Sequence, residues 1–558
     1  MMRKQLFLSL VAIAALVLTS CSKLGPLSAS NFKVEPEPLA TQGGRVPATI
    51  NGLFPEKYMK KNAVVTVTPE LRYGVRDAVR GESTTFQGEK VAGNDQTISY
   101  RLGGHYTMKT SFGYRPEMQK SEMWLTFDAK LGKRKVDLPA VKVATGVIAT
   151  SELYKRTLMN QGACLAPDSF QRVKELKQEA NVKFLVNQAN LRKSELQNNS
   201  VQEFVKLLKR INADKEGLNI RNVEVQAYAS PEGGFAFNDR LANKRQDVSE
   251  DYVSKTLKET KVDSPIDAKY TAQDWEGFQK LVEASNIQDK DVILRVLSMY
   301  KDPEEREQQI RNMSAGFQEL AFGILPELRR SRLIINYETI GRSDAQIKAQ
   351  YQQDPGALSV EELLYAATLE ENISAQEAIY KKTADIYPAD YRALNNLAVL
   401  AFNQGDMNKA KSYIQDAFRV YNRAPEANAN LALMALRDGD IQRATDYVAK
   451  AEGANALNEV LGNLEIAKGN YSQAEEYLKD SNNNSAALAY LLNNDLAQAS
   501  VALKYAKNDA MTDYLQAILN ARMGKNEEAA KWLNSAIKKD ASLADYAEKD
   551  LEMINVRR

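Results

Sequence analysis

The last two hundred or so residues repeat a pattern of small residues, and this pattern constrains the fold more than any other feature. Five similar segments each carry a Gly or Asn at a turn, an Ala five residues later and another small residue twelve residues after the turn. Gly and Asn tolerate the left-handed backbone at a helix end, and small residues let two helices approach closely. The turn positions, spaced by 34, 30, 25 and 30 residues, are Gly405, Gly439, Gly469, Asn494 and Gly524. We therefore expect stacked antiparallel helix pairs over residues 356–558.

This pattern resembles the tetratricopeptide repeat, an all-α solenoid with a concave groove that usually binds a peptide or a partner helix. A degenerate first unit is expected at 360–388. Two interpretations of the apolar groove residues stay open: they contact a partner, or they pack inside the superhelix. The groove positions that the resemblance implies are Arg392, Asn395, Val399, Phe402, Glu426, Ala429, Leu433 and Leu436.

The first 21 residues have the organisation of a bacterial export signal. A short basic start precedes an apolar run over residues 6–18, which is too short to cross a bilayer comfortably. The small residues before Cys21 resemble a lipobox, which implies removal of residues 1–20 and lipid on Cys21. Several acyl chains on one residue give stable anchoring to a membrane. Ordinary secretion with an incidental cysteine is the alternative.

Two segments of different character follow Cys21. Residues 21–45 are dense in Pro, Gly and Ser with weak apolar periodicity, which predicts a flexible tether. Residues 46–160 alternate apolar and polar positions between turn signals, with many β-branched and aromatic residues. This alternation predicts an antiparallel β-sandwich.

Residues 170–345 mix strand-like and helix-like segments in the order β-α-β-α-β, and "RRSRLIINYE" supplies a late strand. This order predicts an α+β domain. The stretch "AYASPEGGFAFNDRLANKRQ" resembles the loop and helix of OmpA-like domains, a peptidoglycan-binding family. The helical stretch at about 275–328 exceeds what that family usually has and is expected to be an insertion.

The OmpA resemblance implies a ligand site. In that family a loop Asp meets the ammonium group of diaminopimelate and a helix Arg meets its carboxylate. Arg245 matches the Arg, whereas Ser230 stands at the Asp position. Glu232 and Asp239 are candidate replacement acids, and Asn238 matches the Asn of the motif. Three interpretations of Arg245 stay open: a ligand contact, a solvated helix residue, or part of a scaffold that has lost its ligand.

Charge and residue counts exclude several classes of function. The chain has 74 Lys and Arg against 72 Asp and Glu, and loss of the two cations in the signal balances them, which argues against a nucleic-acid partner. His105 is the single histidine, and the sequence contains no phosphate-binding loop and no dinucleotide fingerprint. We expect no metal, no cofactor and no enzyme activity. Cys164 is expected to be an inert small residue.

The order of these parts resembles that of outer-membrane lipoproteins of the Bacteroidota. In that phylum, acidic residues directly after the lipidated Cys are associated with surface export, and here the first acid is Glu35. We therefore expect an outer-membrane lipid anchor with the chain facing the periplasm. The expected function is a non-catalytic adaptor that contacts peptidoglycan and docks an envelope or secretion-complex protein through its repeats. The alternative is a structural subunit of an outer-membrane complex whose OmpA-like domain no longer binds peptidoglycan.

Overall fold

The computed structural model describes residues 24–158, 163–287, 289–312 and 314–556. The chain divides into two units: residues up to Asp168 together with those from Ala367 onward, and the central residues Ser169–Ala366. The predicted signal peptide and Cys21 lie outside the described residues. In the described part of the chain, no helix is both long and apolar enough to cross a membrane.

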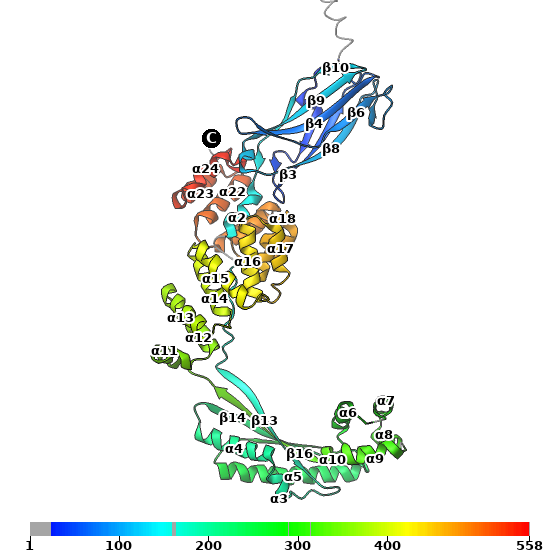
Figure 1. Cartoon of the computed structure of the whole chain (residues 1–558), viewed down its shortest axis with the longest axis vertical. Coiled ribbons are helices and arrows are strands. Elements are labelled where there is room, and N and C mark those ends of the chain that lie inside the picture. The colour runs from blue at the N-terminus through cyan, green and yellow to red at the C-terminus, as the bar shows by residue number, and fades with distance from the viewer. Residues whose placement is uncertain (1–23, 159–162, 288, 313, 557–558) are drawn as a thin grey trace, which may run out of the picture. The chain divides into compact units, whose positions relative to one another are not determined.

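The first unit begins with a β-rich region, as the alternating pattern predicted (Figure 1). One sheet has the strand order β1-β3-β8, and a larger one has β10-β9-β4-β6-β7 with β11 on β9 and β5 on β4. Side chains from both sheets share one apolar core, for example Ile50 of β3 and Val65 of β4. The strands are β1 Phe32–Glu35, β2 Leu39–Ala40, β3 Arg45–Phe54, β4 Ala63–Tyr73, β5 Asp77–Arg80, β6 Thr84–Gly88, β7 Gln96–Ile98, β8 Gly104–Gly113, β9 Ser121–Leu131, β10 Arg134–Asp137, β11 Val141–Thr145 and β12 Val147–Ile148.

The described part of the expected tether, residues 24–45, belongs to this β-rich region instead. Strand β1 pairs with β3, and β2 pairs in parallel with β12. Val34 and Leu39 are buried, and their burial outweighs the Pro-rich composition that suggested flexibility. Pro36 and Pro38 stand between the two strands, where no ladder N–H is required.

Helix pairs form the rest of the first unit, as the repeat pattern predicted. The five turn residues all have positive φ angles, from 62° at Asn494 to 85° at Gly469. The Ala five residues after each turn is fully buried, which fits two helices in close contact. The helices are α13 Ile373–Ile386, α14 Arg392–Asn403, α15 Met407–Val420, α16 Pro425–Arg437, α17 Ile441–Val448, α18 Leu457–Lys468, α19 Tyr471–Leu478, α20 Asn484–Leu492, α21 Leu496–Tyr505, α22 Ala510–Arg522, α23 Asn526–Lys539 and α24 Ser542–Lys549, with the short η7 Leu551–Met553 after them. Helix α12, Val360–Thr368, precedes them and belongs mostly to the central unit.

The chain between β12 and residue 158 packs against these helices. It forms the short helices η4 (Thr150–Leu153) and α2 (Tyr154–Thr157), and α2 lies against α16, α18 and α20. Leu153, Tyr154 and Leu158 are buried in the core of the repeats. The end of the range expected to be β-sandwich therefore belongs to the core of the helical array.

The central unit is an α+β fold with the predicted order of elements. Its sheet has the order β13-β16-β14-β15, in which β14 and β15 are parallel and the other pairs antiparallel. Helices α4 and α5 share the core with this sheet and lie along it (Figure 1). The elements are β13 Val173–Lys183, α3 Lys193–Leu196, α4 Asn199–Ala213, β14 Leu218–Tyr228, α5 Phe235–Thr260, β15 Ile266–Thr271, β16 Arg330–Ile340 and α11 Asp344–Gln353 with the short η6 Pro355–Ala357.

The predicted helical insertion stands between β15 and β16. It has a small apolar core of its own, which includes Phe278, Ile293 and Leu325. Its helices are α6 Trp275–Ala284, α7 Lys290–Met299, α8 Pro303–Asn312, α9 Ser314–Gly323 and α10 Leu325–Leu328.

Candidate functional site

Arg245, the residue expected to meet a ligand or solvent, is 1% exposed on α5. Its Nε donates to the carbonyl of Gln188 at 3.0 Å, Nη1 to that of Tyr228 at 2.8 Å and Nη2 to that of Leu185 at 3.2 Å. The guanidinium also lies 4.9 Å from the ring of Phe184. Burial, with a smaller effect of Arg329, lowers the pKa of Arg245 to about 10. Arg245 therefore ties the chain after β13 to the end of β14, because carbonyls at these strand ends need donors.

Glu232, the candidate replacement acid, pairs with a different arginine. Both Nε and Nη2 of Arg329 donate to Oε1 of Glu232, at 2.9 and 2.7 Å, and Ser230 Oγ donates to the same oxygen at 3.0 Å. Ser230 and Arg329 are both buried. Sequence reasoning missed Arg329, although the "RRSR" run at the start of the last strand offered a signal.

The other two candidates, Asn238 and Asp239, lie in the first turns of α5 and differ in their surroundings. Asn238 is 2% exposed, and its Nδ2 donates to the carbonyls of Ser230, Glu232 and Gly233 at 2.9–3.1 Å. Asn238 thus fixes the loop before α5. Asp239 is half-buried and stands six residues before Arg245 on the same helix, which puts the two side chains on different faces.

The helical insertion contacts this loop. The backbone N–H of Gly233 donates to Glu307 of α8 at 2.7 Å, and Gln273 Nε2 donates to the Gly233 carbonyl at 3.1 Å. A small cavity between loop and insertion is lined by Pro231, Glu232, Trp275, Phe278, Glu307, Ile310, Leu320 and Leu325. The loop that resembles the peptidoglycan site is therefore packed against protein on this side.

In the first unit, the predicted groove of the repeats contains part of the same chain. Residues 163–168, here called the strap, follow α2 in the sequence and lie against α14 and α16. Asn430 accepts from the N–H of Cys164 at 2.6 Å and donates to its carbonyl at 2.9 Å. Asn396 does the same for Ala166, accepting at 2.8 Å and donating at 3.1 Å. Each amide side chain thus closes a ring with one residue of the strap.

The predicted polar groove residues support this arrangement. Asn395 Nδ2 donates to the carbonyl of Cys164 at 2.9 Å, and its Oδ1 accepts from Asn430 at 3.0 Å. Arg392 pairs with Asp390 and donates to the carbonyl of Asp168 at 3.1 Å. Glu426 is buried and accepts a hydrogen bond from the hydroxyl of Tyr391 at 2.8 Å, and it helps to raise the pKa of that tyrosine, which burial raises most.

The predicted apolar groove residues are all buried. Val399, Phe402 and Leu433 line a small apolar cavity beside Ala163 of the strap. Leu436 and Ala429 are fully buried in the core of the repeats. The first three therefore line a cavity shared with the strap, and Leu433 belongs to the core of the repeats together with Leu436 and Ala429.

Asn396 and Asn430, which carry most of the strap contacts, were missed by sequence reasoning. Each stands nine residues before the turn glycine of its own helix pair, at Gly405 and Gly439. The resemblance drew attention to Asn395, one position earlier. The recurrence of Asn at one repeat position, in "NNLA" and "NANLA", is the signal that could have identified the pair.

Cys164 is fully buried in the strap, and burial raises the pKa of its thiol to about 12. It is therefore protonated and unreactive near neutral pH. His105 is exposed on β8. Among the described residues, no group of His, Cys, Asp and Glu side chains could hold a metal ion.

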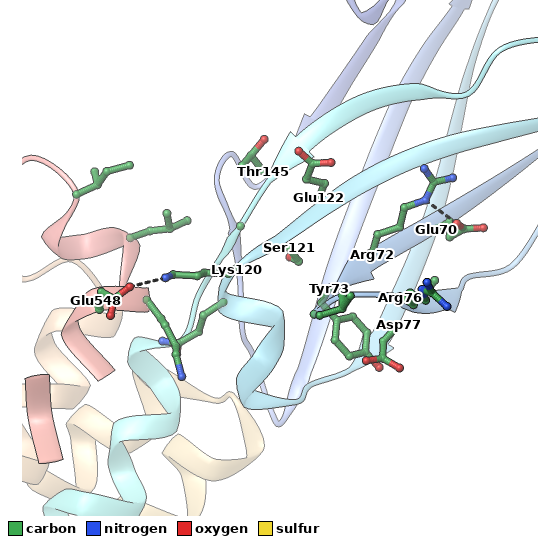
Figure 2. Close-up of a pocket in the computed structure, with 18 residues that line it drawn as sticks. Glu70, Arg72, Tyr73, Arg76, Asp77, Lys120, Ser121, Glu122, Thr145 and Glu548 are labelled. Carbon is green, nitrogen blue, oxygen red and sulfur yellow. Dashed lines mark hydrogen bonds and ion pairs between the residues drawn. The ribbon is translucent and has the colours of Figure 1, made fainter. Parts of the chain in front are cut away.

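A larger cleft of about 590 Å³ lies in the first unit between the β-rich region and the end of the helical array. Figure 2 shows Lys120 and Glu548 facing each other across it, paired at 2.8 Å, and Arg72 paired with Glu70 at 2.7 Å. A cleft of about 950 Å³ on the polar side of the central sheet is similarly filled with ion pairs, such as that of Arg332 with Glu179. In both clefts several of the charged groups are paired with a group of opposite charge.

No family model matches the chain, and no curated protein matches it. A tetratricopeptide repeat protein from Parabacteroides merdae is 16% identical, covers 38% of this chain and 91% of its own, and has a TM-score of 0.28. PilF of Pseudomonas aeruginosa is 15% identical, with 37% and 98% coverage and a TM-score of 0.27. The Cut9–Hcn1 hetero-tetramer of APC/C is 14% identical, with 62% and 74% coverage and a TM-score of 0.29. All three TM-scores are below 0.5, so these similarities carry no conclusion about the function of this chain.

Proposed function

We propose that the chain is a non-catalytic adaptor of the bacterial envelope, anchored by lipid on Cys21 in the periplasm-facing leaflet of the outer membrane. Its helical repeats dock an envelope or secretion-complex protein. One observation supports this proposal most: the repeats hold an extended segment through amide side chains that contact its backbone. Such contacts suit peptide binding, because every peptide offers the same N–H and C=O groups.

The adaptor proposal is tested by cross-linking the tagged full-length chain in intact host cells, followed by mass spectrometry of the linked peptides. We expect recurrent links between lysines of the repeats and one envelope protein. Labelling with a palmitate analogue should modify the parent chain, and Cys21→Ser should lose both the label and the membrane association. Intrachain links alone, or a Cys21→Ser chain that stays in the membrane, would contradict the proposal.

Two versions of this function differ in the role of the central unit. In one the central unit binds peptidoglycan, and in the other it serves protein contacts only. Peptidoglycan binding in the OmpA-like manner needs a free guanidinium and an opposed acid. Arg245 donates instead to three backbone carbonyls, and Glu232 is held by Arg329. These contacts favour the alternative version, a structural subunit whose OmpA-like domain serves protein contacts.

Sedimentation with purified peptidoglycan sacculi tests this choice. We expect the parent chain to stay in solution, and Ser230→Asp, which restores the acid of the family loop, to stay in solution as well, because Arg245 remains engaged. If the parent sediments with sacculi and Glu232→Gln does not, the peptidoglycan-binding version is correct. Unfolding midpoints of each variant show whether a loss of binding reflects a loss of fold.

A further inference from the structure

The backbone of the strap makes hydrogen bonds with side chains of the groove that do not depend on which residue is bound. Asn396 and Asn430 each bond both the N–H and the C=O of one strap residue, and Arg392 bonds the carbonyl of Asp168. A different extended peptide could therefore make the same hydrogen bonds in the same place.

The side chains of the strap that face the groove are small. The residues that face the groove, Ala163, Cys164 and Ala166, are all small, whereas Leu165 is 48% exposed and Pro167 is exposed as well. The methyl group of Ala163 does not fill the cavity beside it. The apolar walls of this cavity are formed by Ala398, Val399, Phe402, Leu433 and Met434. The strap thus satisfies the polar groups of the groove without filling its apolar part.

The chain just before the strap is held differently. Leu153 and Tyr154 are 1% and 4% exposed and belong to the core of the repeats. Cys164 of the strap belongs to the same core. Release of the strap would therefore withdraw the Cys164 side chain from the core, while residues 150–158 stay packed in it.

We propose that the strap is an exchangeable occupant, and that the groove takes an extended peptide of a partner protein. This inference rests on the adaptor function proposed above. The preferred peptide carries a side chain of about valine size at the Ala163 position and small residues at the Cys164 and Ala166 positions. In the absence of that partner, the strap covers the groove and keeps Asn396 and Asn430 bonded.

A tethered segment competes strongly, since its effective concentration in the groove is on the order of millimolar. A partner peptide needs an added contact to displace it, and the cavity beside Ala163 supplies one. Filling it with the two extra methyl groups of valine should tighten binding by about tenfold.

Cys164 gives a direct measure of strap release, because its thiol is buried when the strap is bound. In a full-length chain with Cys21→Ser it is the single thiol. The measured quantity is its rate of modification by an aromatic disulfide reagent near pH 8. The probes are the capped hexapeptides Ala-Ser-Leu-Ala-Pro-Asp, a thiol-free copy of the strap, and Val-Ser-Leu-Ala-Pro-Asp.

We expect the valine peptide to raise the Cys164 rate to a plateau, and the alanine copy to need about tenfold more peptide for the same effect. The same valine peptide N-methylated at its second and fourth residues should have no effect, because it lacks the N–H groups that Asn430 and Asn396 accept from. Ala163→Val in the chain should lower the basal rate and weaken the effect of the peptide. Asn396→Ala with Asn430→Ala should raise the basal rate, whereas Asn463→Ala, whose side-chain amide bonds only its own helix at the Glu459 carbonyl, should not.

The proposal is overturned if the valine peptide leaves the Cys164 rate unchanged while the double asparagine variant raises it. The strap would then be releasable but the groove closed to other peptides, and the adaptor function would depend on another surface. A rate that changes in none of the variants would show a permanently fixed strap and also overturn the proposal. Neither result affects the cross-linking test, so the two proposals fail independently.

Discussion

Asn396 and Asn430 occupy the same position in two consecutive helix pairs, and each closes a two-way hydrogen-bonded ring with one residue of the strap. The residues they hold, Cys164 and Ala166, are two apart. Alternate residues of an extended chain point to the same side, so the spacing of the helix pairs matches the period of the strap. The side-chain amides of Asn396 and Asn430 therefore hold the strap in register with the helical array.

Asn430→Ala should lower the free energy of unfolding of the first unit by about 1–3 kcal/mol, because it leaves the buried N–H of Cys164 without an acceptor. Asn463→Ala is the matched control: Asn463 is equally buried but donates within its own helix, so its loss should cost about 1 kcal/mol or less. Urea unfolding followed by circular dichroism measures both. Equal losses in the two variants would mean that the strap contributes no stability.

Arg245→Met should destabilise the central unit by about 3–5 kcal/mol, as it removes a buried cation together with the donors of three carbonyls. Arg245→Lys keeps the charge but cannot reach all three oxygens, and should fall between Met and the parent chain. Arg240→Ala, at an exposed position of the same helix, should change stability by less than about 0.5 kcal/mol. Thermal unfolding compares the three variants. If the Arg245→Met chain is as stable as the parent, Arg245 has no structural role and is again a candidate ligand contact.

The carboxyl group of Asp550 should make the first unit less stable as the pH rises. Burial raises its pKa from an ordinary value of 3.8 to about 6, while the hydroxyl of Tyr514 donates to it at 2.7 Å. Between these two values the folded chain binds more protons than the unfolded chain, so the free energy of unfolding falls through that window, by about 3 kcal/mol in total.

Asp550→Asn removes this titration while keeping the shape of the side chain. The variant should match the parent chain near pH 4 and exceed its stability above about pH 6. Unfolding midpoints measured across this range give the difference between the two chains, in which the contributions of other carboxyl groups cancel. A constant difference would show that Asp550 titrates normally.

Gly405→Asn should be tolerated within about 1 kcal/mol, because Asn494 holds the same turn position with a φ of 62°. Gly405→Val places a β-branched residue at a φ of 79° and should cost about 2 kcal/mol. An added Cβ meets nothing within 4 Å at this glycine, so the difference between the two variants isolates backbone strain. Chemical unfolding measures this difference in stability. Equal costs in the two variants would mean that backbone strain is not the reason for glycine at position 405.

Structural features were predictable from the sequence where the residues in contact lie close together along the chain. The turn residues and the Ala positions of the repeats were predictable, because they act within about forty residues of each other. The strap was not, since Asn430 meets Cys164 across 266 residues and no local pattern joins them. The strands at 32–40 were missed because a composition rich in Pro concealed two buried residues, Val34 and Leu39.

The candidate site in the central unit shows a second limit. The resemblance placed Arg245 after the correct strand, loop and helix, and those elements are present. It could not indicate that the carbonyls of Leu185 and Gln188 accept hydrogen bonds from Arg245. Nor could it indicate that Glu232 pairs with Arg329, 97 residues away. Both outcomes depend on which backbone groups remain without donors once the strands have paired.

The first unit is built from two segments of the sequence, one before the central unit and one after it: residues up to Asp168 and residues from Ala367 onward. During synthesis, which proceeds from the amino end, about two hundred residues of the central unit must therefore be added before η4, α2 and the strap can meet their helices. A chain that stops early would present Leu153, Tyr154 and the backbone of residues 163–168 to the proteases of its compartment. The topology thus makes completion of synthesis a condition for resistance to degradation.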